Sequence, residues 1–166
     1  IIESSAKSLL CILNDVLDIS KIQSGNFEIK IGKINLKKIS EKVFGLYLTK
    51  ANEKKVEISL DVDKNIPSCV LTDGERIEQV LSNLVSNAIK FTEQNGKINF
   101  NISLINKNDK SAKIRFLVGD NGIGIAKDKI KNIFEPFIQV DNDVNRKYEG
   151  TGLGLSICSH IIKSLN

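Results

Sequence analysis

The spacing of apolar residues changes at Gly25, and this change limits the folds that the chain can adopt. Before Gly25 the apolar residues recur every seven positions, as at Ile2, Leu9 and Val16. This repeat predicts a helix over residues 1–24 that packs against other helices. After Gly25, short stretches of alternating apolar and polar residues are interleaved with longer stretches of helical spacing. The interleaving predicts an α+β domain preceded by one long helix.

The elements of this domain are predicted from periodicity and from residues that start or stop helices. We expect helices over residues 36–52 and 73–92, the second with Asp73 as its N-cap, and a last helix from near Gly152. A short helix is expected after Gly124, stopped by Pro136. Extended segments are expected at residues 27–31, 56–62, 69–71, 98–104 and 114–118, of which the last two form an antiparallel hairpin.

Composition argues against several classes of protein. The 166 residues are 41% hydrophobic, and their net charge of +4 forms no clustered basic face, which argues against a nucleic-acid partner. The longest apolar run, Leu9–Leu13, is far shorter than the roughly 18 residues of a membrane span. Three widely spaced cysteines and one histidine make neither a disulfide framework nor a zinc site. We therefore expect a soluble, cytoplasmic piece of a longer protein.

A polar stripe distinguishes the predicted 73–92 helix. At about 100° per residue, Asn83, Asn87 and Lys90 fall within a sector of about 60°. Apolar residues occupy the opposite side, so the helix can pack inward while it presents two amides and an ammonium group. A solvated helix face explains the stripe equally well.

Two glycine-rich segments are candidates for ligand contact. Asp120–Ile125 directly follows a predicted strand and combines a carboxylate that accepts from an exocyclic amine with two glycines, although a tight turn explains it as well. Gly150–Leu155 has glycines at alternate positions before a helix, whose first N–H groups can hold phosphates. Leu155 stands where a dinucleotide-binding fingerprint needs glycine, so that fingerprint is excluded.

Three further patterns are rejected. The acidic spacing that starts at Asp141 has Arg146 where a calcium loop needs glycine. Lys90 follows Ala-Ile, as in eukaryotic protein kinases, but it lies on a predicted helix and no His-Arg-Asp loop is present. His160 has apolar neighbours on the last helix and is interpreted as a packing or surface residue.

Taken in order, the motifs resemble those of the sensor histidine kinases. Residues 83–92 resemble the N box of that family, 120–125 its first glycine box, 134–137 its F box and 150–155 its second glycine box. Residues 15–25 resemble the end of the second helix of the dimerisation and phosphotransfer domain. The resemblance therefore covers nearly the whole chain.

The resemblance implies a two-layer α/β sandwich of the type shared with gyrase and MutL, in which three helices back a mixed sheet. Residues 1–25 would be part of the dimerisation and phosphotransfer domain, and residues 26–166 the ATP-binding domain. By the same resemblance, the first phosphotransfer helix with its phosphoacceptor histidine is absent, and the chain stops before the closing strands of the sheet. Because it lacks its own phosphoacceptor, the fragment is expected to be inactive alone.

The resemblance also implies roles around a bound ATP. Asn87 would ligate Mg²⁺, Asn83 and Lys90 would approach the phosphates, and Asp120 would accept from the adenine amine. Arg146 and Lys147 would meet the γ-phosphate from a lid over residues 138–149. The other nucleotide-binding positions would be Gly122, Gly124, Ile125, Phe137, Gly150, Thr151, Gly152, Leu153 and Gly154. Asn121 and Glu149 depart from the usual Thr and Gly, and both changes look tolerable.

The expected function is donation of the γ-phosphoryl group of ATP to a histidine on a separate helix of the parent protein or its dimer mate. A response regulator receiver domain would be a partner, the full protein would be a homodimer, and Arg146-Lys147-Tyr148 resembles hybrid kinases. Two alternatives stay open. A gyrase-type ATP hydrolase needs a general base where Asn83 stands, and an amide cannot act as one. An inert nucleotide-binding or dimerisation module is the other.

Overall fold

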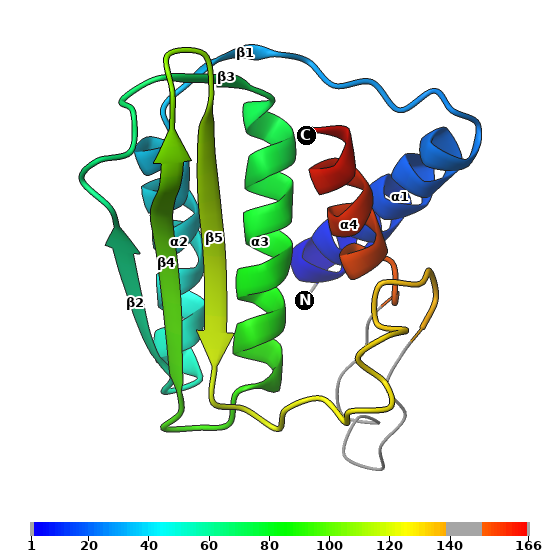
Figure 1. Cartoon of the computed structure of the whole chain (residues 1–166). Helices are drawn as coiled ribbons and strands as arrows, with labels where there is room; N and C mark the ends of the chain where they lie inside the picture. The colour runs from blue at the N-terminus through cyan, green and yellow to red at the C-terminus, as the bar shows by residue number, and fades with distance from the viewer. Residues whose placement is uncertain (1, 139–150, 166) are drawn as a thin grey trace. The chain divides into compact units, whose positions relative to one another are not determined.

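The computed structural model of the chain describes residues 2–138 and 151–165. Two compact units make up the chain: Lys30–Gly124 is one, and Ile1–Ile29 with Ile125–Asn166 is the other. Figure 1 shows the elements of both. Each unit is taken in turn.

A mixed three-stranded sheet organises the Lys30–Gly124 unit, as predicted for an α+β fold. Its order is β2 (Glu57–Val62), β4 (Lys97–Lys107) and β5 (Ala112–Asp120), with β2 parallel and β5 antiparallel to β4. A second, two-stranded antiparallel sheet pairs β1 (Gly32–Ile34) with β3 (Val70–Thr72).

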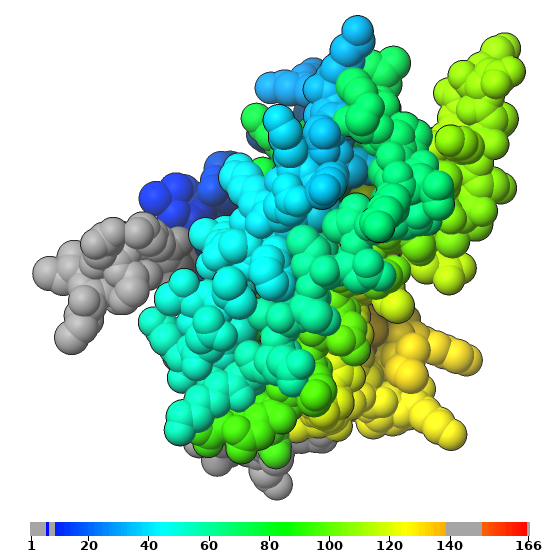
Figure 2. Space-filling view, turned by 90° about the vertical axis from the view of Figure 1, so that its left-hand side faces the viewer, coloured from blue at the N-terminus to red at the C-terminus, as the bar shows by residue number. Residues whose placement is uncertain are grey.

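Two helices, α2 (Leu36–Glu53) and α3 (Gly74–Phe91), pack against each other and against the larger sheet. Their bounds agree with the predicted helices within two residues. Helix α2 (light blue to cyan) lies on the face of the unit that Figure 2 shows, where the tip of the β4–β5 hairpin (yellow-green) projects.

The core of this unit lies between α3 and β4. Helix α3 starts at Asp73, whose carboxylate accepts from Arg76 N at 3.1 Å as an N-cap. Helical spacing then places its buried apolar residues on one side: Ile77, Val80, Leu81, Val85, Ala88 and Ile89. From β4, Ile98, Phe100 and Ile102 are at most 1% exposed. Full burial of each large apolar side chain contributes about 1.5–3 kcal/mol, so this layer holds α3 in place.

The other face of the sheet is polar. The parallel register of β2 and β4 places Glu57 opposite Lys97, Ser59 opposite Asn99 and Asp61 opposite Asn101. Each pair interacts, as an ion pair of 2.9 Å, a hydrogen bond of 3.1 Å and a hydrogen bond of 2.9 Å respectively. Alternation along the strands therefore separates a buried apolar face from a hydrated polar face.

In the other unit, α1 (Ile2–Gln23) contacts α4 (Gly154–Ser164). Helix α1 ends before Gly25, which has a φ of +72° that favours glycine. Six large apolar side chains of α1 stay between 44% and 68% exposed: Leu9, Leu10, Ile12, Leu13, Val16 and Leu17. Among the residues that the structure describes, no helix has the length and apolar content needed to cross a membrane.

Two predicted elements are wrong. The extended segment expected at residues 27–31 is not a strand; β1 lies at Gly32–Ile34, where β3 supplies a pairing partner. In place of the short helix expected after Gly124, the chain forms a series of turns. Their backbone hydrogen bonds run mainly to the residue three positions earlier, as from Lys129 N to Ala126 O at 2.9 Å. The stretch before Pro136 is too short for its hydrogen bonds to offset the unfavourable free energy of α-helix nucleation.

Candidate functional site

Helix α3 carries two amides that are joined to each other. Asn87 Nδ2 donates to Asn83 Oδ1 at 2.9 Å, and both side chains are half-buried. Because its nitrogen is used in this bond, Asn87 presents Oδ1 as the atom that can bind a cation, while Asn83 keeps its amide hydrogens for an anion. The pair thus has a cation-binding end and an anion-binding end.

Lys90 lies one turn further along the same helix and is half-buried. Its Nζ is 4.8 Å from the centroid of the Phe91 ring, and burial lowers the pKa of its ammonium group. An ammonium group that has lost part of its hydration interacts more strongly with a nearby anion than a fully hydrated one.

The oxygen of Asn87 fits an Mg²⁺ ion that arrives with a nucleotide. Mg²⁺ is commonly held by one or two protein oxygens, together with phosphate oxygens and water. Asn87 Oδ1 is such an oxygen, on a helix fixed by the core. Within residues 2–138 and 151–165, no group of three or more His, Cys, Asp or Glu side chains could hold a metal ion.

The loop that follows β5 is closed by its own carboxylate. Asp120 Oδ1 accepts from Gly122 N at 2.9 Å, which leaves Oδ2 of the exposed Asp120 to accept from a ligand. Two residues later Gly124 has a φ of +70°, a conformation that favours glycine.

Helix α3 and this loop meet within the Lys30–Gly124 unit. Ile123 N donates to Phe91 O at 3.2 Å. A Cβ atom on Gly122 would lie against that same carbonyl oxygen, 2.8 Å from Phe91 C and 2.9 Å from Asp120 Oδ1. Glycine is therefore required at position 122 for the loop to reach the end of α3.

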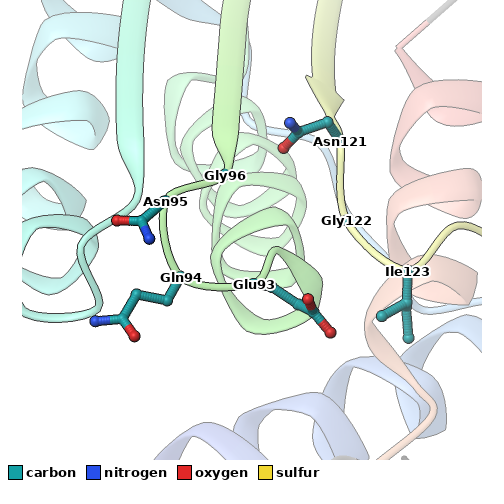
Figure 3. Close-up of a pocket in the computed structure, with 7 residues that line it drawn as sticks. All are labelled: Glu93, Gln94, Asn95, Gly96, Asn121, Gly122 and Ile123. Atoms are coloured by element: carbon teal, nitrogen blue, oxygen red, sulfur yellow. The ribbon is translucent and has the colours of Figure 1, made fainter.

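A pocket of about 360 Å³ lies where these segments end (Figure 3). Its lining consists of Glu93, Gln94, Asn95, Gly96, Asn121, Gly122 and Ile123. It shares Gly122 with the predicted site, whereas Asn83, Asn87 and Lys90 are not part of the lining. Asn121 is not among the predicted site residues, and it binds the first residue of β4, since Lys97 N donates to Asn121 Oδ1 at 2.7 Å. An Asn-Gly pair directly after a strand was the available signal.

The other predicted site residues that the structure describes lie in the Ile1–Ile29 and Ile125–Asn166 unit. There the F box and the second glycine box meet, because Phe137 N donates to Gly152 O at 3.1 Å. Gly152 has a φ of +69°, and an added Cβ would lie 3.0 Å from Ile138 O. Ile125 and Phe137 are exposed at 49% and 67%.

Thr151 links the start of α4 to α1 in the same unit. Leu153 N donates to Thr151 Oγ1 at 3.2 Å, and Thr151 Oγ1 lies 3.4 Å from Asp15 Oδ2. Leu153 is buried and Gly154 begins the helix. Burial raises the pKa of Asp15, an effect that the contact with Thr151 opposes.

The predicted lid residues Arg146 and Lys147, with Gly150, lie outside the described residues.

The close approach of Gly122 to α3 predicts a loss of stability in Gly122→Ala. The new methyl group meets backbone atoms, so the free energy of unfolding should fall by about 1–3 kcal/mol, as for other overpacked sites. Gly119→Ala is the matched control, because nothing lies within 4 Å of a Cβ there. It should stay within about 0.5 kcal/mol of the parent chain. Denaturant unfolding of both variants measures the difference, and equal midpoints would show that the loop relaxes freely.

Comparison with known proteins places these features in a family. Residues 72–166 match the family described as "Histidine kinase-, DNA gyrase B-, and HSP90-like ATPase". The autoinducer 2 sensor kinase/phosphatase LuxQ of Vibrio cholerae is 38% identical over 163 residues, which are 98% of this chain and 19% of LuxQ. The chain spans between 8% and 19% of the length of the curated relatives compared with it.

Two solved structures share the fold along nearly the whole chain. Full-length ShkA in complex with AMPPNP has a TM-score of 0.79 and 32% identity, covering 97% of this chain and 32% of ShkA. The histidine kinase ThkA in complex with the response regulator protein TrrA has a TM-score of 0.67 and 29% identity, covering 96% of this chain and 42% of that one. The chain therefore belongs to the histidine kinase-, DNA gyrase B- and HSP90-like ATPase family, and the relatives it resembles within that family are histidine kinases.

Proposed function

We propose that this chain binds Mg²⁺–ATP and supplies its γ-phosphoryl group to a histidine on a separate helix of a sensor histidine kinase. The observation that carries the proposal is the contact between α3 and the loop after β5, where Ile123 N donates to Phe91 O at 3.2 Å. This contact ties the helix of Asn83, Asn87 and Lys90 to the loop of Asp120. The ShkA complex with the ATP analogue AMPPNP supports a nucleotide as the ligand.

The residues divide by the part of the nucleotide that they would bind. Asp120 Oδ2 would accept from the adenine amine, Gly122 and Gly124 would admit the base, and Asn83 and Lys90 would bind phosphate oxygens. Asn87 Oδ1 would hold Mg²⁺, which neutralises phosphate charge and orients the triphosphate when bound. The remaining contacts would come from Ile125, Phe137, Arg146, Lys147, Gly150, Thr151, Gly152, Leu153 and Gly154.

Catalysis in this proposal is positioning and neutralisation of charge. An imidazole nitrogen of the acceptor histidine attacks the γ-phosphorus, the bond to the β,γ-bridging oxygen breaks, and ADP leaves, while the imidazole N–H proton passes to a base on the acceptor domain. The amides and the ammonium group of α3 hold the triphosphate in line and balance the charge that moves to the leaving group.

The proposed domain division assigns residues 1–25 to the dimerisation and phosphotransfer domain and residues 26–166 to the ATP-binding domain. The exposed apolar side chains of α1, among them Leu9 at 68% and Leu13 at 54%, support a homodimer of the full protein through this helix.

The acceptor histidine would come from the parent protein or its dimer mate. A response regulator receiver domain is the proposed next acceptor, supported by the complex of ThkA with TrrA. We place this activity in the cytoplasm.

Hydrolysis of ATP is the competing activity, and α3 disfavours it. A hydrolase of the gyrase type needs a general base one turn before the metal ligand. Asn83 occupies that position, and its Oδ1 already accepts from Asn87 Nδ2 at 2.9 Å. A carboxamide does not take up a proton near neutral pH, so water would not be activated there.

Base recognition tests the proposal directly. Asp120 Oδ1 is held by Gly122 N, so in Asp120→Asn the Nδ2 group faces the ligand in place of Oδ2. A donor there opposes the adenine amine and matches the guanine carbonyl. We expect the ratio of ATP to GTP affinity to fall by about tenfold, which is the effect of losing one matched hydrogen bond to the base.

Calorimetric titration with each nucleotide in the presence of Mg²⁺ measures this ratio. Asp61→Asn is the control, since the Asp61 carboxylate also accepts one hydrogen bond, from Asn101 Nδ2 at 2.9 Å, but lies on the polar face of the sheet. It should keep the parent preference. An unchanged ratio in Asp120→Asn would remove Asp120 from the base site, and a parent chain without affinity for ATP would contradict the proposed function.

A further inference from the structure

We propose that Asn121 is a positioning residue for nucleotide recognition: its side chain fixes the loop that presents Asp120 to the base. The inference rests on the proposed function, because it concerns the same site. Figure 3 shows the Asn121 side chain directed from the end of β5 towards the start of β4 at Gly96.

Two hydrogen bonds join Asn121 to Lys97 at the end of the β4–β5 pairing, and one of them uses the side chain of Asn121. Ile98 and Asp120 form the last residue pair of the β4–β5 register. Beyond it, Asn121 N donates to Lys97 O at 3.2 Å, while Lys97 N donates to the side-chain Oδ1 of Asn121 at 2.7 Å. In a regular antiparallel pair the second bond would go to the backbone carbonyl. The side chain of Asn121 takes the place of that carbonyl.

Because a side-chain oxygen replaces the backbone carbonyl as the acceptor, the backbone can leave the sheet at Asn121. With Lys97 N satisfied by the side chain, the chain turns at Gly122 towards α3 and makes the bond from Ile123 N to Phe91 O. Gly96 leaves room for the arrangement, since an added Cβ would lie 2.8 Å from Asn121 Oδ1. Asn121 is thus the point at which the loop is anchored to β4.

The orientation of the Asp120 carboxylate depends on the bond between Asn121 and Lys97. Its carboxylate is held by Gly122 N at 2.9 Å, and Gly122 is held between the Asn121 anchor and the α3 carbonyl. Loss of the side-chain acceptor at position 121 frees Lys97 N and one end of the loop. Gly122 N and the Asp120 carboxylate would then sample more than one orientation, which weakens contact with the base.

The test compares three variants by calorimetric titration with Mg²⁺–ATP and Mg²⁺–GTP. Asn121→Ala removes the acceptor and should lower ATP affinity about fivefold, with a smaller ratio of ATP to GTP affinity, as expected for loss of one hydrogen bond. Asn121→Asp keeps an oxygen at the same reach and should restore both values to within about twofold.

Asn99→Ala is the matched control. Its side chain also accepts one cross-strand bond, from Ser59 Oγ at 3.1 Å, but it lies on the polar face of the sheet. It should leave both affinities unchanged. If Asn121→Ala does not fold, Asn121→Ser, whose hydroxyl is one bond shorter in reach, is measured in its place with the same expectation.

The outcomes separate this inference from the proposed function. A parent chain that binds ATP, together with Asn121→Ala that loses only thermal stability and keeps its ATP to GTP ratio, would overturn the positioning role. Failure of Asn121→Asp to restore affinity would also overturn it. A parent chain that binds no ATP would overturn the proposed function itself, whatever the variants do.

Discussion

Asn87→Asp is expected to weaken Mg²⁺-dependent ATP binding by about a hundredfold. In the parent chain Asn87 Nδ2 donates to Asn83 Oδ1 at 2.9 Å. The carboxylate of the variant cannot donate, so two acceptors would face each other, and Asn83 would lose the bond that orients it. The variant also places a negative charge beside the triphosphate, and such like-charge contacts cost several kcal/mol where water is partly excluded.

Calorimetric titration with ATP, with and without Mg²⁺, measures this effect. Asn106→Asp introduces the same charge and is the control, because Asn106 is exposed near the far end of β4, by the turn of the hairpin. It should bind ATP like the parent chain. Equal affinity in Asn87→Asp and the parent would show that α3 does not contact the phosphates through Asn87.

Helix α3 shows why much of the fold can be predicted from the sequence. Its apolar residues follow the helical period for five turns, and Asp73 supplies a local start signal, so the helix is encoded by its own residues. Strand β1 is the opposite case. Three residues carry little signal, and the strand exists because Gly32 pairs with Thr72, forty positions away. Pairing over such a distance is a tertiary property that periodicity cannot reveal.

The candidate site divides in the same way. Asn83, Asn87 and Lys90 could be placed together by helical geometry, because they lie within two turns of one helix. The direction of the amide pair and the contact of Ile123 N with Phe91 O depend on packing between segments. Asn121 stands where Thr is usual, and its bond to Lys97 N depends on the register of β4 and β5, which the sequence alone does not reveal.

A second large effect is expected in phosphoryl transfer, where this chain should act as donor only. Incubated with γ-labelled ATP and Mg²⁺, it should acquire no acid-labile phosphate. His160, the single histidine, packs its ring edge-to-face against Phe27, with centroids 5.1 Å apart and planes at 89°. Its neighbours in the chain are Ser159 and Ile161, neither of which takes up the proton that an imidazole must release when it attacks phosphorus.

Addition of a separate phosphoacceptor domain that contains its own histidine completes the experiment. Label should appear on that domain alone, and it should disappear when the histidine of that domain is replaced or when Asn87→Asp is used as the donor. His160→Gln should transfer label as well as the parent chain, because the proposed donor role uses no part of its ring. Label found on the parent chain and lost in His160→Gln would instead make His160 a phosphoacceptor, and the chain would then contain both halves of the transfer reaction.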